Sequence, residues 1–343
     1  MGDILSVLEN FLEVYTYSSK LLGEKTKIFD WLIRRIRGEM DTNKLFASEI
    51  LNTLAVEGNN QIILAKKQVL PHFLKILLEF QNKKISDLEE EEFIYNIVNT
   101  ICSLLLKREN QIIFSNSDGV IIMLNFLKEN NIFRHFAIKI LDFATQNNAN
   151  NCKDLIELEG LALIFSYFMG KGIRKKKKAK LDSLIETCEE HCISILVSLA
   201  KYSRGIQLDR FIYKFKENNQ EKCERLLEYW NYYNKKFEKN YKEKIEENEN
   251  IIEEEQDEES KYLEKINSGL FNIQNVGLIM YFLQSLNDDQ IKEKLRNLMI
   301  LNNVDSNEIK GAVKDIYIHI GDEIEKTDSP STKIFIENLL NIN

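Results

Sequence analysis

The sequence predicts an all-α fold in the form of a solenoid of stacked helical repeats. The first observation is that the 343 residues include only 13 Gly and 2 Pro. Large sheets need many turns, and turns draw on these two residues, so their scarcity favours long helices joined by short polar loops. The second is a hydrophobic content of 44%, which is ample for a core. The third is an internal repeat.

An apolar motif recurs along the first two thirds of the chain. Its copies are residues 50–54, 97–101, 140–144 and, more weakly, 195–199, with separations of 47, 43 and 55 residues. A second landmark follows the first three copies, at residues 60–64, 110–114 and 150–155. A period of about 40–47 residues built from two or three helices is typical of armadillo and HEAT solenoids. In these folds neighbouring helical pairs stack and share one continuous core.

Local signals mark where helices begin and where the chain turns. Residues 86–89 and 305–308 read as capping boxes, which predict helix N-termini. Gly119 and Gly160 each precede an apolar run, and we interpret them as turn residues. Neither lies in a Walker or dinucleotide-binding pattern, so a phosphate loop is not predicted.

The pattern divides the chain into four parts. We expect an armadillo-like repeat array over residues 1–215, a long helix extending it over 216–245, an acidic linker over 246–260, and a C-terminal helical cap over 261–343. The linker prediction depends on charge, because a run of like charges repels itself and resists packing.

The net charge of −8 comes from one segment. Residues 246–259 contain nine acids and no base, so the remainder of the chain carries −8 + 9 = +1. Phosphate neutralisation needs cations clustered over a face, so direct binding of nucleic acid is not expected. The acidic run is interpreted as a solubilising linker, with attraction of basic partner tails as the alternative.

The cysteines, the apolar stretches and the first residues indicate in which cellular compartment the protein is expected. Five Cys are an odd, scattered set, typical of reduced thiols in the cytosol or nucleus. No apolar stretch approaches the roughly 20 residues that span a bilayer, so no membrane association is predicted. The first ten residues carry acids rather than a basic segment, which is unlike a signal peptide.

Several short motifs, in order along the chain, resemble the beta-catenin-like protein 1 family. They are residues 41–51; 151–153 with 160–161, 164–165 and 168–169; 189–191 with 194–196 and 198–199; 204–205 and 214–215 with 217–218; 269–271; and 320–322. The resemblance runs from about Trp31 to the end without large gaps. The family has a longer N-terminal portion with a basic localisation stretch, which this chain is expected to lack.

The resemblance implies a non-catalytic, armadillo-like nuclear protein associated with the spliceosome's nineteen complex. It implies partners that are splicing factors, bound through basic segments of the nuclear-localisation type. It implies no enzymatic activity and no cofactor, and a homodimer is permitted. The alternative is an import-receptor-like adaptor that carries nuclear cargo.

In armadillo arrays the last helix of each repeat lines a concave groove, which gives a candidate peptide site. The equivalent positions here are Asn52, Asn99 and Asp142, with Glu49 one turn earlier and Trp31 as a stacking platform. An Asn offers both a donor and an acceptor to a peptide backbone. The alternative is that these positions form a plain solvated helix face, with Trp31 in the core.

Two further clusters contain residues that could bind a metal or serve as an import signal. Cys188, His191 and Cys192 share a helix face and suggest a metal site, but no fourth ligand is visible, so core-packed thiols are the favoured interpretation. Residues 174–178 with Lys180 are the one dense basic run, either an import signal or a solvated loop between helices. The four His have no paired nucleophile at a readable spacing, so no catalytic residue is predicted.

Overall fold

The predicted all-α solenoid is confirmed by the structure, a computed structural model. It describes residues 2–15, 17–81, 83, 85, 87–129, 131–170, 179–248, 258–320 and 331–341, and within these ranges all regular secondary structure is helical. The chain divides into two compact units, Met1–Leu158 and Glu159–Asn343. The basic run at 174–178 and most of the acidic run, 249–257, lie outside the described residues.

The first unit is built from eleven described helices. They are α1 (Gly2–Val14), α2 (Tyr17–Lys25), α3 (Ile28–Ile36), α4 (Thr42–Ala55), α5 (Gly58–Lys66), α6 (Val69–Gln81), α7 (Leu88–Leu105), α8 (Arg108–Asn116), α9 (Gly119–Lys128), α10 (Phe133–Thr145) and α11 (Ala149–Glu157).

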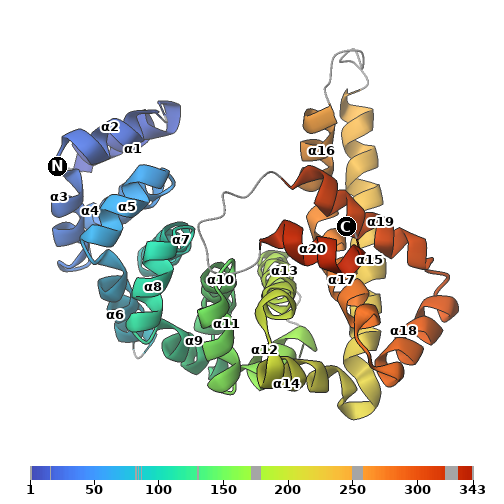
Figure 1. The fold of residues 1–343 in the computed structure, drawn as a ribbon. Coiled ribbons are helices and arrows are strands. Elements are labelled where there is room, and N and C mark those ends of the chain that lie inside the picture. The colour runs from blue at the N-terminus through green and yellow to red at the C-terminus, as the bar shows by residue number, and fades with distance from the viewer. Residues whose placement is uncertain are drawn as a thin grey trace. The chain divides into compact units, whose positions relative to one another are not determined.

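These helices follow a three-helix repeat. A short helix and a second helix precede a third one, as in α5–α6–α7 and α8–α9–α10. Corresponding helices pack on each other: α1 contacts α4, α4 contacts α7 and α7 contacts α10, while α2, α5 and α8 form a second row (Figure 1). We call α1, α4, α7 and α10 the third-helix layer. Its core positions, such as Leu51, Ile97 and Leu141, are fully buried members of the recurring apolar motif.

The second landmark of the repeat contains a buried Asn that links neighbouring helices. Asn60, Asn110 and Asn151 are each the third residue of a short helix and each is fully buried. The Asn60 side-chain amide donates to the carbonyl oxygens of Leu54 and Ser19, both at 2.9 Å. These carbonyls belong to the last turn of α4 and to α2. One amide of α5 therefore binds the end of the helix before it and the corresponding short helix of the preceding repeat.

The turn between the first two helices of a repeat differs from the prediction by one residue. Gly119 and Gly160 are the first residues of α9 and α12, and the left-handed backbone lies just before them, at Asp118 (φ 57°) and Glu159 (φ 63°). Gly119 is required for another reason: a Cβ there would approach the Phe114 ring to 2.5 Å.

Helix capping agrees with one of the two predicted boxes. Asp305 caps α19, and its carboxylate accepts from the Asn307 backbone N–H at 2.9 Å. The cap of α7 is Asp87, whose carboxylate accepts from the Glu90 N–H at 2.8 Å, so the box predicted to begin at residue 86 was placed one residue early.

The second unit contains nine described α-helices and one short 3₁₀ helix. They are α12 (Gly160–Phe168), α13 (Ala179–Tyr202), α14 (Gly205–Lys216), η1 (Asn218–Gln220), α15 (Glu221–Asn248), α16 (Glu258–Asn267), α17 (Leu270–Ser285), α18 (Asp289–Leu301), α19 (Ser306–His319) and α20 (Thr332–Leu340).

Helix α17 is the centre of this unit. It packs against α13, α15, α18 and α19, and its residues from Ile273 to Met280 are all buried. Gly277 lets α17 approach α15, since a Cβ there would stand 3.0 Å from the Trp230 ring. The four-part division predicted from the sequence is a different partition from these two packing units, and it stays a prediction.

Candidate functional site

The predicted groove residues lie mostly on the third-helix layer. Glu49 and Asn52 are on α4, Asn99 is on α7 and Asp142 is on α10. Trp31 is different: it is half-buried on α3, which is the second helix of its repeat and lies outside this layer. The repeat register therefore brings four of the five predicted residues to one layer of the first unit.

Two members of this set, Asn99 and Asp142, already form hydrogen bonds with neighbouring side chains. The Asn99 side-chain oxygen accepts a hydrogen bond from Lys139 Nζ at 2.7 Å, so a cation of α10 already occupies that amide. Asp142 is only 4% exposed, and its carboxylate accepts from Gln146 Nε2 at 3.0 Å. A buried, hydrogen-bonded carboxylate is poorly placed to meet a partner's lysine, so the accessible acids of the layer must be sought elsewhere.

Those acids are Glu9, Glu49 and Glu92, on the adjacent helices α1, α4 and α7, which we call the carboxyl trio. Glu9 and Glu49 are half-buried and Glu92 is exposed. Each affects its neighbours: the carboxyls of Glu9 and Glu49 share a hydrogen bond, and the charge of Glu92 acts on both. Within the described ranges, no Lys, Arg or His lies within ion-pair distance of any of the three.

Two carboxyls of the trio, those of Glu49 and Glu9, have raised pKa values. Burial raises the pKa of Glu49 to about 7, and the charges of Glu9 and Glu92 and the proton that Glu49 shares with Glu9 add to the effect. Burial also raises the pKa of Glu9. Burial beside two like charges, with no cation close by among the described residues, therefore keeps a proton on Glu49 near neutral pH.

The trio suits an organic cation. In the part of the chain that the structure describes, no group of three or more His, Cys, Asp or Glu could hold a metal ion. A Lys ammonium or an Arg guanidinium donates several hydrogen bonds, so it can bind more than one carboxyl at once.

The sequence pattern identified Glu49 but missed Glu9 and Glu92. Glu92 belongs to a run of four Glu near the N-terminus of α7, where acids are favourable to the helix dipole, so the run by itself does not indicate a site. The available signal was the helical spacing: Glu92 precedes Asn96 by one turn, and Asn96 Nδ2 donates to Ser48 Oγ of α4 at 3.1 Å. Glu9 could be found only by extending the repeat register back to α1.

The alternative metal triplet is explained by packing. Cys188 and Cys192 are buried on α13, and the Cys192 thiol donates to the carbonyl oxygen of Ile164 at 3.6 Å. No helix within the described ranges is both long and apolar enough to cross a bilayer.

Comparison with known proteins adds the family. The profile of the family described as Catenin-beta-like, Arm-motif containing nuclear, matches residues 1–314. Human Beta-catenin-like protein 1 is 31% identical over 332 residues, covering 93% of this chain and 58% of that protein. The Beta-catenin-like protein 1 homolog of Schizosaccharomyces pombe is 24% identical over 343 residues, covering 95% of this chain and 58% of that protein.

A computationally designed armadillo repeat protein for modular peptide recognition is similar with a TM-score of 0.49 and 12% identity, covering 91% of this chain and 98% of that one. The present chain spans about three fifths of the length of the relatives it matches (58% for the human protein). On the match over residues 1–314, the chain belongs to the Catenin-beta-like family of Arm-motif-containing proteins.

Proposed function

We propose that the chain is a non-catalytic nuclear scaffold of the pre-mRNA splicing machinery that binds basic, extended peptide segments on its third-helix layer. The observation that carries the binding proposal is the carboxyl trio, which has no cationic partner among the described residues. The family relationship supports the scaffold role, and the resemblance set out from the sequence supports splicing factors of the nineteen complex as partners.

The physical reason for binding is charge complementarity, together with relief of the repulsion among the three carboxylates. Holding Glu9, Glu49 and Glu92 near one another is unfavourable when all are ionised. A Lys or Arg side chain placed among them releases the shared proton and supplies hydrogen-bond donors to the freed oxygens. The half-buried Asn52 lies one turn further along α4, where its amide is available to an extended backbone.

The test is calorimetric titration with a capped tetrapeptide of Lys and Arg at pH 8. Glu49→Gln and Glu92→Gln are expected to weaken binding by about 1–2 kcal/mol each, which is about 5- to 30-fold in Kd. Glu109→Gln is the matched control, because Glu109 is exposed on α8 and its loss changes the net charge equally. Equal weakening in all three variants would reduce the effect to net charge and reject the site.

The nuclear and splicing parts of the proposal need their own experiment. Pull-down from nuclear extract with the whole chain, compared with the Glu49→Gln/Glu92→Gln double variant, should recover splicing factors only with the unmodified chain. Imaging of a fluorescent fusion tests the nuclear location directly. Recovery of transport receptors in place of splicing factors would support the import-adaptor alternative instead.

A further inference from the structure

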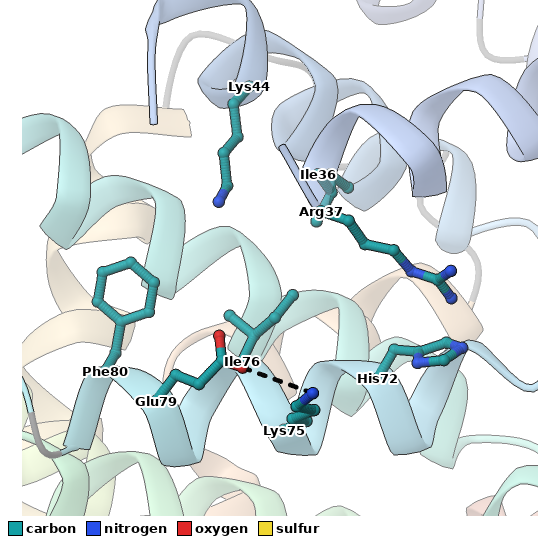
Figure 2. Close-up of a pocket in the computed structure, with 8 residues that line it drawn as sticks. All are labelled: Ile36, Arg37, Lys44, His72, Lys75, Ile76, Glu79 and Phe80. Atoms are coloured by element: carbon teal, nitrogen blue, oxygen red, sulfur yellow. Dashed lines mark ion pairs between the residues drawn. The ribbon is translucent and has the colours of Figure 1, made fainter. Parts of the chain in front are cut away.

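A second site lies in the first unit, in a pocket of about 350 Å³ between α3, α4 and α6. We call it the lysine pocket; it is lined by Ile36, Arg37, Lys44, His72, Lys75, Ile76, Glu79 and Phe80. Figure 2 shows Lys44 extending from α4 toward α6, and Arg37 reaching over the side of His72. Most of the walls come from α3 and α6, outside the third-helix layer, and α4 contributes only Lys44. None of the carboxyl trio lines the pocket, so the two sites have no residue in common.

The pocket has an excess of positive charge. Arg37, Lys44 and Lys75 face one carboxylate, Glu79, whose oxygen lies 3.9 Å from Lys75 Nζ (Figure 2). The neighbouring Asp41 acts on Lys44 only in part, because its carboxylate pairs with Arg35. Among the described residues, neither Arg37 nor Lys44 has a carboxylate within ion-pair distance. The lining therefore carries a net charge of about +2 at neutral pH.

Lys44 is the residue that a purely structural role explains least. It is only 8% exposed, and its Nζ donates to the carbonyl oxygen of Gly38 at 3.0 Å and stands 4.6 Å from the centre of the Phe93 ring. Both contacts are weaker compensation for a buried ammonium than a carboxylate would be. Burial lowers the pKa of Lys44, and the charge of Arg35 lowers it further.

The position of Lys44 along α4 adds to this mismatch. It lies in the first turn, three residues after the capping Asp41, where the helix dipole disfavours a cation. The same dipole and the same cations attract an anion. A lysine in the first turn is therefore unfavourable for helix α4. Such local conflicts are expected at ligand sites more than at positions that serve folding alone.

The remaining walls indicate what else the anion carries. Ile36, Ile76 and Phe80 are buried apolar side chains beside the cations. His72 is half-buried, and burial together with the charges of Arg37 and Lys75 lowers its pKa, so near neutral pH it offers a neutral ring. A group of two negative charges attached to a small organic part matches both the charge and the apolar walls.

We propose that the lysine pocket binds a phosphate monoester, held by Lys44 and Arg37 with its organic part against Ile76 and Phe80. A phosphate monoester carries about −1.5 to −2 at pH 7, which matches the excess charge of the pocket. The group could come from a small organic phosphate or from a phosphorylated serine of a peptide, and the experiment distinguishes these sources. The site does not depend on the proposed function of the carboxyl trio.

The experiment is calorimetric titration of the whole chain at low salt with three probes. They are phenyl phosphate, a capped Ala-phosphoserine-Ala peptide and the same peptide without phosphate. Saturable 1:1 binding of phenyl phosphate alone identifies a small-molecule site, and comparable binding of the phosphopeptide identifies a phosphoprotein partner. Both outcomes support the proposal, whereas binding of the unphosphorylated peptide with equal affinity overturns it.

Variants tie the binding to this pocket. Lys44→Met and Arg37→Gln should each weaken the phosphate probe by about tenfold or more. Lys66→Gln is the matched control, since Lys66 is exposed on α5 and its loss changes the net charge equally. Arg37 is itself exposed, so its variant keeps the test valid if Lys44→Met fails to fold. No saturable binding of any phosphate probe, or equal weakening by Lys66→Gln, overturns the proposal.

Discussion

The carboxyl of Glu49 on α4 shares a hydrogen bond with the carboxyl of Glu9 on α1, two residues 40 positions apart in the sequence. Two acids can share a hydrogen bond only while one of them keeps its proton, and the pKa of Glu49, raised by burial to about 7, lets it do so near neutrality. This pair therefore makes the stability of the first unit depend on pH.

The first prediction is that Glu49→Gln stabilises the protein at pH 8 and not at pH 4. The folded-state pKa of Glu49 is above its unfolded value, so its favourable contribution is complete below about pH 4.5 and is lost as pH rises through about 7. Gln keeps the hydrogen-bonding shape without the charge. We expect a gain of about 1–2 kcal/mol at pH 8, allowing for the partial exposure of the side chain. Urea unfolding at the two pH values measures it, and an equal gain at both would contradict the assignment.

The second prediction concerns proton release on binding of a basic peptide. At pH 7 about half of the Glu49 carboxyls hold a proton, which the peptide's cation must displace. Affinity should therefore rise as pH increases from 6 to 8, although the peptide's charge is constant there. Titration in two buffers of different ionisation enthalpy should show protons leaving the complex. Glu49→Gln should abolish both effects, and a pH-independent affinity in the unmodified chain would disprove the link.

The third prediction contrasts two Gly→Ala substitutions inside helices. Gly119→Ala places a Cβ 2.5 Å from the buried Phe114 ring, so overpacking should cost about 1–3 kcal/mol. Gly311→Ala on α19 has no atom within 4 Å of the new Cβ, and the better helix propensity of Ala should stabilise by up to about 1 kcal/mol. Chemical denaturation of the two variants should give opposite signs; the same sign would show that propensity alone decides both.

The fold class could be predicted because it depends on short-range patterns. The recurring apolar motif marks the buried face of each third helix, and helical spacing alone places Leu51, Ile97 and Leu141 in one layer. The turn was predicted one residue late, at Gly119. Glycine is the usual residue for a left-handed backbone, but here Asp118 adopts that conformation and Gly119 makes room for Phe114.

The candidate site was less predictable because exposure depends on tertiary packing. Asn99 and Asp142 occupy the register expected of groove residues, yet Lys139 occupies the amide of Asn99, and Asp142 is buried beside Gln146. Glu9 and Glu92 have no motif of their own and become neighbours of Glu49 only when α1, α4 and α7 stack. The lysine pocket likewise joins residues of α3, α4 and α6 that no spacing rule connects.

The fourth prediction is that Asn110→Ala destabilises the first unit although no ligand is involved. Asn110 is fully buried on α8, and its side-chain amide donates to the carbonyl oxygen of Gln61 on α5 at 3.1 Å, which ties neighbouring repeats together. Removing the donor leaves a buried carbonyl without this bond and opens a cavity, so the cost should be about 1–3 kcal/mol. Asn52→Ala is the control, because Asn52 is half-buried and forms no hydrogen bond within the described ranges, so its effect should stay within about 0.5 kcal/mol. Urea unfolding of both variants separates an amide that holds repeats together from the amide of Asn52, which we propose faces a partner. Equal losses would show that the buried amides are not what aligns the repeats.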